Sequence, residues 1–190
     1  NTGCMPTKAL VASAYAAHLA RRGADFGVVT GDIGLDMKKV AARAYKVTMD
    51  ARSGVEKWLH GMKNVTVMTG HARFQNATTL QVGDEVISAP KIFLNVGGRA
   101  AIPPIPGLAE VPYLTNSSIV TLDHVPEHLI IIGGSYIALE FAQMYRRFGA
   151  QVSIVEKGDR LIAREDTDIS DAIRQILEDE GIAVHTGVDI

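Results

Sequence analysis

The sequence predicts an α/β protein, and three patterns carry that prediction. An apolar strand at 129–132 leads through a glycine turn into a helix at 136–148 and then a strand at 152–155, which is the order of a βαβ unit. Short runs of alternating apolar and polar residues between 65 and 96 predict a small β-meander. Two long helical patterns precede this meander.

The two N-terminal helices are indicated by their ends. Residues 6–22 are rich in alanine and close with two arginines, followed by a glycine as C-terminal cap. Asp36 is a suitable N-cap for a second helix that runs to about Met62, with an interruption or bend expected near Gly54. Between the two helices, Phe26–Val29 is expected to form a short strand or loop.

The remaining elements follow from changes in the apolar period. The meander is expected to contain five short strands, at 65–69, 72–74, 79–82, 85–88 and 92–96. Three prolines stiffen an extended linker at 101–107. An amphipathic helix at 168–180, which ends at Gly181, and a strand at 182–185 extend the βαβ pattern.

Composition argues against several classes of function. The chain is 47% hydrophobic and 21% charged with a net charge of −2, so it lacks the basic excess of nucleic-acid or anionic-membrane binders. No apolar run approaches the roughly 20 residues of a membrane helix. One cysteine points to a reducing, cytoplasmic location, and the six histidines show no metal-ligand spacing. The chain does not begin with Met, so we expect the natural N-terminus to lie upstream.

The glycine turn before the helix at 136–148 predicts a dinucleotide site. Gly133 takes the tight-turn position of the Gly-x-Gly-x-x-Gly/Ala template, Ser135 stands at its second glycine, and Ala138 allows close helix–strand packing. The N–H groups at the helix start favour a pyrophosphate, which makes Gly133, Gly134 and Ser135 candidate cofactor-binding residues. The alternative is a glycine turn in an ordinary βα unit.

The end of the next strand bears on the choice of dinucleotide. Glu156 lies close to the expected spacing of about 20 residues from the turn. Its carboxylate would accept a hydrogen bond from a ribose 2′-hydroxyl and repel a 2′-phosphate, which favours NADH. Lys157 could instead attract the phosphate of NADPH, or be a solvated surface charge. We therefore expect NADH, with NADPH as the alternative.

A second motif opens the chain and leads into its first helix, with the sequence Asn1-Thr2-Gly3-Cys4-Met5-Pro6-Thr7-Lys8. Glycine lets the backbone pass close to a flat ligand, and proline suits a first helical turn. The positive N-terminal end of a helix favours a thiolate over a thiol. The alternative is a buried Cys4 that packs as a small hydrophobe.

This motif resembles the redox-active segment of the class I pyridine nucleotide-disulfide oxidoreductases, which include mercuric reductase, dihydrolipoamide dehydrogenase and glutathione reductase. The family pattern is Cys-x-Asn-x-Gly-Cys-x-Pro-[Ser/Thr/Lys]-Lys, and the chain matches it at Asn1, Gly3, Cys4, Pro6, Thr7 and Lys8. The first cysteine of the pattern would lie two residues before Asn1. Residues 70–74 resemble a family strand, Gly-x-Ala-x-Phe, and residues 91–99 resemble another, in which Asn95-Val96-Gly97 replaces Ala-Thr-Gly.

The resemblance implies a fold and a set of site residues. It implies a partial FAD-binding doubly wound domain with a small β-meander at 1–110, followed by the N-terminal part of a Rossmann-like NAD(P)-binding domain at 111–190. It implies catalytic roles for Cys4, Lys8 and Glu140, with Lys8 and Glu140 paired near the flavin. The cofactor-binding residues that it implies are Asn1, Gly3, Thr7, Lys8, Gly70, His71, Ala72, Asn95, Val96, Gly97, Tyr136, Ile137 and Glu140.

The activity implied is hydride transfer from NAD(P)H to FAD, followed by electron transfer to a Cys-x4-Cys disulfide whose second cysteine is Cys4. The substrate would be a small-molecule disulfide, a thiol-bound metal or another oxidant, and the parent enzyme would be a homodimer. We expect this stretch to be an internal fragment that is inactive and binds FAD poorly by itself. Two alternatives stay open: a non-catalytic NAD(H)-binding or sensing module, and a disulfide-free flavin transhydrogenase of the same fold.

Overall fold

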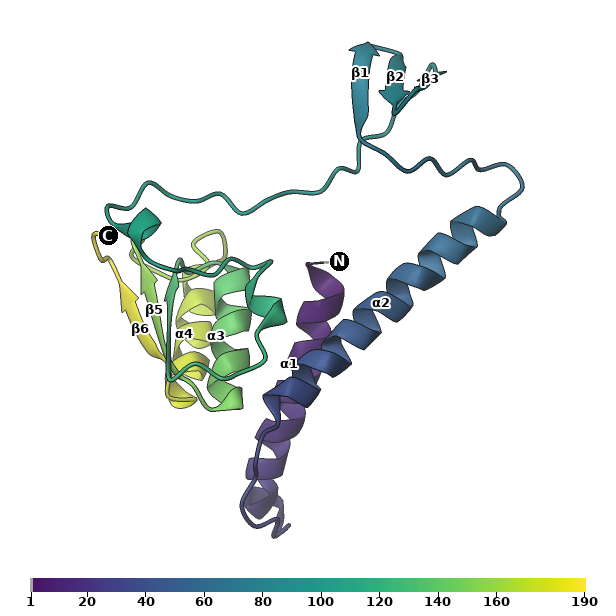
Figure 1. Ribbon diagram of the computed structural model, residues 1–190. Coiled ribbons are helices and arrows are strands. Elements are labelled where there is room, and N and C mark those ends of the chain that lie inside the picture. The colour runs from purple at the N-terminus through teal and green to yellow at the C-terminus, as the bar shows by residue number, and fades with distance from the viewer. Residues whose placement is uncertain (1) are drawn as a thin grey trace. The chain divides into compact units, whose positions relative to one another are not determined.

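The computed structural model describes residues 2–190 and combines helices with two three-stranded sheets, which confirms the predicted α/β class (Figure 1). The chain forms two compact units. The first contains the residues up to Met49 together with Ile102–Ile190, and the second is Asp50–Ala101.

A parallel sheet with two covering helices forms the larger part of the first unit. Its strands, in spatial order, are β4 (His128–Ile132), β5 (Gln151–Glu156) and β6 (Ala183–Thr186). The crossover helices α3 (Tyr136–Phe148) and α4 (Thr167–Asp179) lie on the same face of the sheet (Figure 1). The bounds of α3 are those predicted, and the other four elements begin and end within two residues of their predicted ends.

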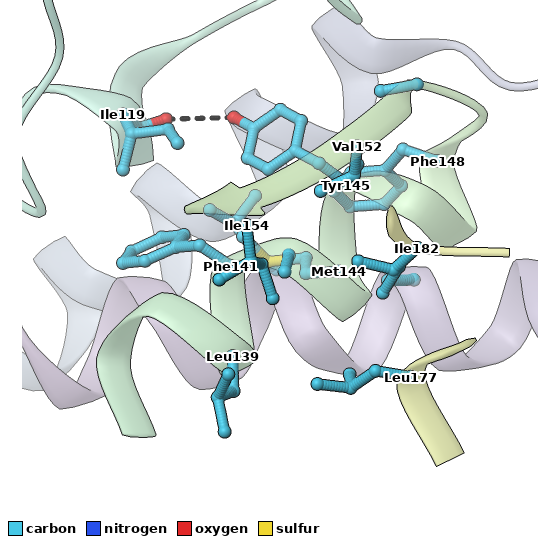
Figure 2. Close-up of a cluster of buried hydrophobic side chains, with 14 of the residues drawn as sticks. Ile119, Leu139, Phe141, Met144, Tyr145, Phe148, Val152, Ile154, Leu177 and Ile182 are labelled. Atoms are coloured by element: carbon cyan, nitrogen blue, oxygen red, sulfur yellow. Dashed lines mark hydrogen bonds between the residues drawn. The ribbon is translucent and has the colours of Figure 1, made fainter. Parts of the chain in front are cut away.

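The core of this unit lies between the sheet and α3. Figure 2 shows Phe141, Met144 and Tyr145 of α3 beside Val152 and Ile154 of β5. These side chains are at most 6% exposed. The alternating burial along β5 reflects the two-residue period of a strand that packs on one face.

Helix α1 (Cys4–Arg21) packs against α3 through small side chains. Ala9, Ala14 and Ala17 are buried on its inner face, and alanine lets the two helix backbones approach closely. The helix begins two residues before its predicted start. A 3₁₀ turn, Gly23–Phe26, follows it, and no strand forms at Phe26–Val29 in the described chain.

Helix α2 (Met37–Gly61) is continuous, so the predicted interruption near Gly54 is wrong. A single glycine weakens a helix by about 1 kcal/mol, which the other residues of a long helix can offset. The predicted N-cap is confirmed, because Asp36 Oδ1 accepts the N–H of Lys39 at 3.1 Å. This hydrogen bond from the Lys39 backbone is the main cause of a lowered pKa for Asp36.

The second unit contains an antiparallel meander of β1 (Ala72–Asn76), β2 (Thr79–Val82) and β3 (Glu85–Ser88). The strands predicted at 65–69 and 92–96 are wrong, because neither segment forms a strand. Phe93 and Val96 are each 87% exposed. An apolar run becomes a strand only where a neighbouring strand takes up its hydrogen bonds.

Candidate functional site

An ion pair joins two helices whose sequence motifs lie 132 residues apart. Lys8 Nζ on α1 donates to Glu140 Oε1 on α3. The Lys8 side chain is 64% exposed and that of Glu140 is 27% exposed, so the pair lies at the surface of the first unit. Surface pairs add little to stability, and the exposed part of each side chain is accessible to a ligand.

Contacts near the ends of both helices fix the position of this pair. The early residues of α1 and α3 meet through Lys8 and Glu140, and the late residues meet where Arg21 Nη1 donates to the carbonyl oxygen of Arg147. The Arg147 guanidinium also lies 5.9 Å from the centre of the Tyr15 ring. Helix α1 is therefore held at both ends, with its alanine face buried between them.

A cavity of about 720 Å³ surrounds the ion pair within the first unit. It contains seven residues that the sequence predicted for the site, namely Gly3, Cys4, Thr7, Lys8, Tyr136, Ile137 and Glu140. Sequence reasoning missed its other wall, which comes mainly from α4 and the loop before it: Ile162, Glu165, Ile169, Ile173, Ile176 and Leu177. The apolar face of α4 was visible as a helical period, but nothing in the sequence showed that it lines the same cavity as α1.

The first turn of α1 presents Cys4 at the helix N-terminus. Cys4 is exposed, so the alternative of a buried packing cysteine does not hold. Pro6 lies in the first turn, as expected, and is buried. The Thr7 hydroxyl donates to the carbonyl oxygen of Gly3 at 2.9 Å and is therefore used within the helix. Asn1 lies outside the described residues, and its predicted contact with the cofactor stays a prediction.

The glycine turn has the backbone geometry that its sequence requires. Gly133 has φ of +111°, a conformation that side-chain-bearing residues rarely adopt. Ser135 has φ of −80° and ψ of 168°, an extended conformation open to any residue, which explains why serine is tolerated at the second glycine position. The first hydrogen bond within α3 runs from the Leu139 N–H to the carbonyl oxygen of Ser135 at 3.1 Å. The backbone N–H groups before Leu139 therefore lie ahead of the hydrogen-bond ladder of the helix.

The carboxylate of Glu156 reaches back to this turn from the end of β5. Its Oε2 accepts the N–H of Gly134 at 2.5 Å, and its Oε1 accepts the N–H of Gly158 at 2.6 Å. A Cβ at Gly134 would lie 2.9 Å from the Leu161 side chain and 3.0 Å from that of Glu156, so a larger residue there would displace these side chains. The dinucleotide template leaves this position open, and sequence reasoning gave Gly134 no such role.

Lys157 points to a different partner. Its Nζ lies 3.6 Å from Asp189 Oδ1, and both side chains are largely exposed. The remaining predicted cofactor residues, Gly70–Ala72 and Asn95–Gly97, belong to the second unit. Gly70 and His71 lead into β1, which begins at Ala72, and Asn95–Gly97 have no regular structure. Their predicted contacts with the cofactor stay predictions.

The chain matches a family model and several known proteins over nearly its whole length. The family model described as pyridine nucleotide-disulphide oxidoreductase matches residues 1–190. The chain is 36% identical over 189 residues to a probable pyridine nucleotide-disulfide oxidoreductase, RclA, of Escherichia coli K12. This alignment covers 97% of the chain and 39% of that protein. It is 31% identical over 189 residues to a mercuric reductase of Bacillus cereus, over 98% of the chain and 30% of that protein.

Solved structures give the same result. The structure of the HOCl-induced flavoprotein disulfide reductase RclA from Escherichia coli superposes with a TM-score of 0.82 at 34% identity, and the match covers all of this chain and 40% of that one. The chain thus spans well under two thirds of these relatives. Within the described part of the chain, no helix has the length and apolar character needed to cross a membrane.

Proposed function

Because the chain belongs to the pyridine nucleotide-disulphide oxidoreductase family, we propose that the protein carrying it is a flavin-dependent enzyme that uses NADH to reduce a disulfide or a related oxidant. The observation that carries the proposal is the cavity in which Cys4 lies beside the Lys8–Glu140 ion pair. Two motifs distant in the sequence supply the three side chains of one site.

The residues of the cavity fit the ring system of FAD. Its volume of about 720 Å³ is in the range of cofactor sites. Nothing lies within 4 Å of where a Cβ on Gly3 would stand, so a flat ring could approach the backbone there. The lining combines apolar side chains with the charges of Lys8 and Glu140. FAD bound there would supply the two-electron chemistry.

The side chains of the chain would position and hold charge in this site. The Lys8 ammonium can donate hydrogen bonds to a ligand while Glu140 keeps it oriented. Cys4 presents its sulfur at the positive end of α1, which favours an anionic sulfur when a disulfide opens. Its disulfide partner in the proposal is a cysteine two residues before Asn1, at the substrate side.

The dinucleotide would bind at the glycine turn, with its pyrophosphate at the N-terminus of α3. Gly133, Gly134 and Ser135 form the turn, and Glu156 stands at its rim to accept the ribose hydroxyls. NADH is the proposed donor and NADPH the alternative. The pairing of Lys157 with Asp189 supports the preference for NADH over NADPH, since it gives the lysine a partner other than a 2′-phosphate.

The proposed substrates are small-molecule disulfides, thiol-bound metals or other oxidants. Relatives named mercuric reductase, dihydrolipoyl dehydrogenase and disulfide reductase support the class without deciding among its members. We propose a cytoplasmic homodimer with an FAD-binding part at 1–110 and an NAD(P)-binding part at 111–190. The isolated 190-residue chain is proposed to be inactive by itself.

The proposal is tested on the full-length protein with bound flavin. Wild type should bleach its flavin absorbance when mixed anaerobically with NADH and then reduce a model disulfide such as lipoamide or dithionitrobenzoate. Cys4→Ser should retain flavin reduction but lose disulfide reduction, whereas Ser13→Ala, on the same helix, should retain both. Absence of bound flavin, or of its reduction by either nucleotide, would contradict the proposal and would favour a binding module.

A further inference from the structure

One side chain ties the end of β5 to the glycine turn. The two carboxylate oxygens of Glu156 accept different main-chain N–H groups, that of Gly134 at 2.5 Å and that of Gly158 at 2.6 Å. Hydrogen bonds to an ionised acceptor are shorter and stronger than neutral ones. Because each oxygen has its own donor, rotation of the carboxylate would break one bond or both.

The two donors belong to backbone that is itself held in place. The carbonyl oxygen of Gly158 accepts the N–H of Gly187 at 2.7 Å, and that of Glu156 accepts the N–H of Val188 at 3.2 Å. On the other side, the carbonyl oxygen of Gly134 accepts the N–H of Ile162 at 2.8 Å. The carboxylate is therefore fixed by a framework that includes the segment after β6.

Glycine at both donor positions lets the carboxylate lie against the backbone. A Cβ at Gly134 would stand 3.0 Å from Glu156 Oε2, and a Cβ at Gly158 would stand 3.1 Å from Oε1. Both distances are tighter than ordinary contacts between such atoms. The carboxylate can therefore lie this close to the backbone because neither glycine carries a side chain.

We propose that Gly158 is a positioning residue for nucleotide selection, and that its N–H, together with that of Gly134, fixes the Glu156 carboxylate against a 2′-phosphate. The proposal rests on the proposed dinucleotide site at the glycine turn. A carboxylate oxygen has a second lone pair, so Glu156 can still accept a ribose hydroxyl. It cannot rotate away from a 2′-phosphate, and the two negative charges held together would repel each other.

The test compares two redox-inert probes on the flavin-loaded full-length protein. Calorimetry measures the Kd of ADP-ribose and of its 2′-phosphate for wild type, Gly158→Pro and Gly158→Ala. Proline removes the N–H donor, whereas alanine retains it. We expect wild type to prefer ADP-ribose about a hundredfold, Gly158→Pro to lower that preference about tenfold, and Gly158→Ala to lower it about twofold.

If the Gly158→Pro protein does not retain its flavin, Glu156→Asp serves as a second variant. It keeps the charge but shortens the side chain, which withdraws the carboxylate from the two amides, and it should also lower the preference about tenfold. An unchanged preference in the folded variants would overturn the role of Gly158, as would a wild type that prefers the 2′-phosphate. Reduction of the wild-type flavin by NADH reports on the proposed function separately, so the two proposals fail by different observations.

Discussion

Helix α3 carries a charged pair near each of its ends, and the two pairs differ in burial and in the number of bonds. Near the start, Glu140 accepts from Lys8, whose side chain is 64% exposed. Near the end, Arg147 donates to both carboxylate oxygens of Glu180, at 2.8 and 2.6 Å, and these side chains are 15% and 17% exposed. The late pair connects elements of the fold, whereas the early pair stays open to a ligand.

The late pair is also the centre of a wider network. Gln143 Nε2 donates to Glu180 Oε1 at 2.8 Å, and Arg146 Nε donates to the Glu180 carbonyl oxygen at 2.8 Å. Arg147 in turn contacts α1 through Tyr15 and Arg21. The exposed pair at the site is therefore positioned by contacts at the opposite end of the same two helices.

Loss of the late pair should have the largest effect on stability. Glu180→Ala leaves the largely buried Arg147 guanidinium without its carboxylate and should lower the free energy of unfolding by about 2 kcal/mol. Glu178→Ala is the matched control, because its pair with Arg174 is more exposed and should contribute about 0.5 kcal/mol or less. Urea unfolding measures both, and equal losses would contradict the difference between buried and exposed pairs.

Acid should weaken the same region by a smaller amount. Burial raises the pKa of Glu180, but the hydrogen bond and charge of Arg147 outweigh it, so the pKa falls below its ordinary value of 4.5. A lowered carboxyl pKa contributes stability above about pH 4.5 that is lost as the pH falls through the folded-state value. Burial, followed by the charge of Arg147, likewise lowers the pKa of His18 below 6.5, which gives a loss that begins below that pH.

The measurement is the urea midpoint between pH 7 and pH 3 for wild type and two variants. Glu180→Gln should flatten the lower part of the curve, and His18→Gln the part just below pH 6.5. Curves that keep the wild-type shape in both variants would assign the acid sensitivity to other groups.

Removal of a buried hydroxyl should have the next effect. Tyr145 is fully buried, its hydroxyl donates to the carbonyl oxygen of Ile119 at 3.0 Å, and burial raises its pKa to about 12 (Figure 2). Tyr145→Phe keeps the ring but leaves that carbonyl oxygen without this donor, which should cost about 1 kcal/mol. Tyr45→Phe, at a residue 68% exposed, should change the unfolding free energy by less than about 0.5 kcal/mol.

Removal of the early pair should affect stability least and function most. Lys8→Gln should change the free energy of unfolding by less than about 0.5 kcal/mol, because the pair is exposed. The same change should slow flavin reduction by NADH about tenfold, since the proposed site would lose a charge beside the reacting atoms. Lys39→Gln, which removes another exposed lysine paired with a helix carboxylate, should leave that rate within about twofold. Similar rates in the two variants would remove Lys8 from the site.

Elements with sharp ends were predictable from the sequence. The bounds of α3 follow from the turn before it and from Gly149, which takes a φ of +113° at the helix end. Gly181 has φ of +80° just past α4, where a Cβ would meet the Arg146 guanidinium at 2.8 Å. The strand predictions at 65–69 and 92–96 were wrong, because an apolar run does not specify whether a partner strand exists.

By itself, the sequence determined the motifs: Cys4 before a helix, the glycine turn at Gly133, and an acidic residue at the end of the next strand. These depend on local backbone geometry, which neighbouring residues set. Only the tertiary structure decided that α4 walls the cavity and that Glu156 bonds the amides of Gly134 and Gly158. The α4 wall of the cavity and the Glu156–Gly134 bond join segments at least 22 residues apart, and they depend on packing that no local pattern encodes.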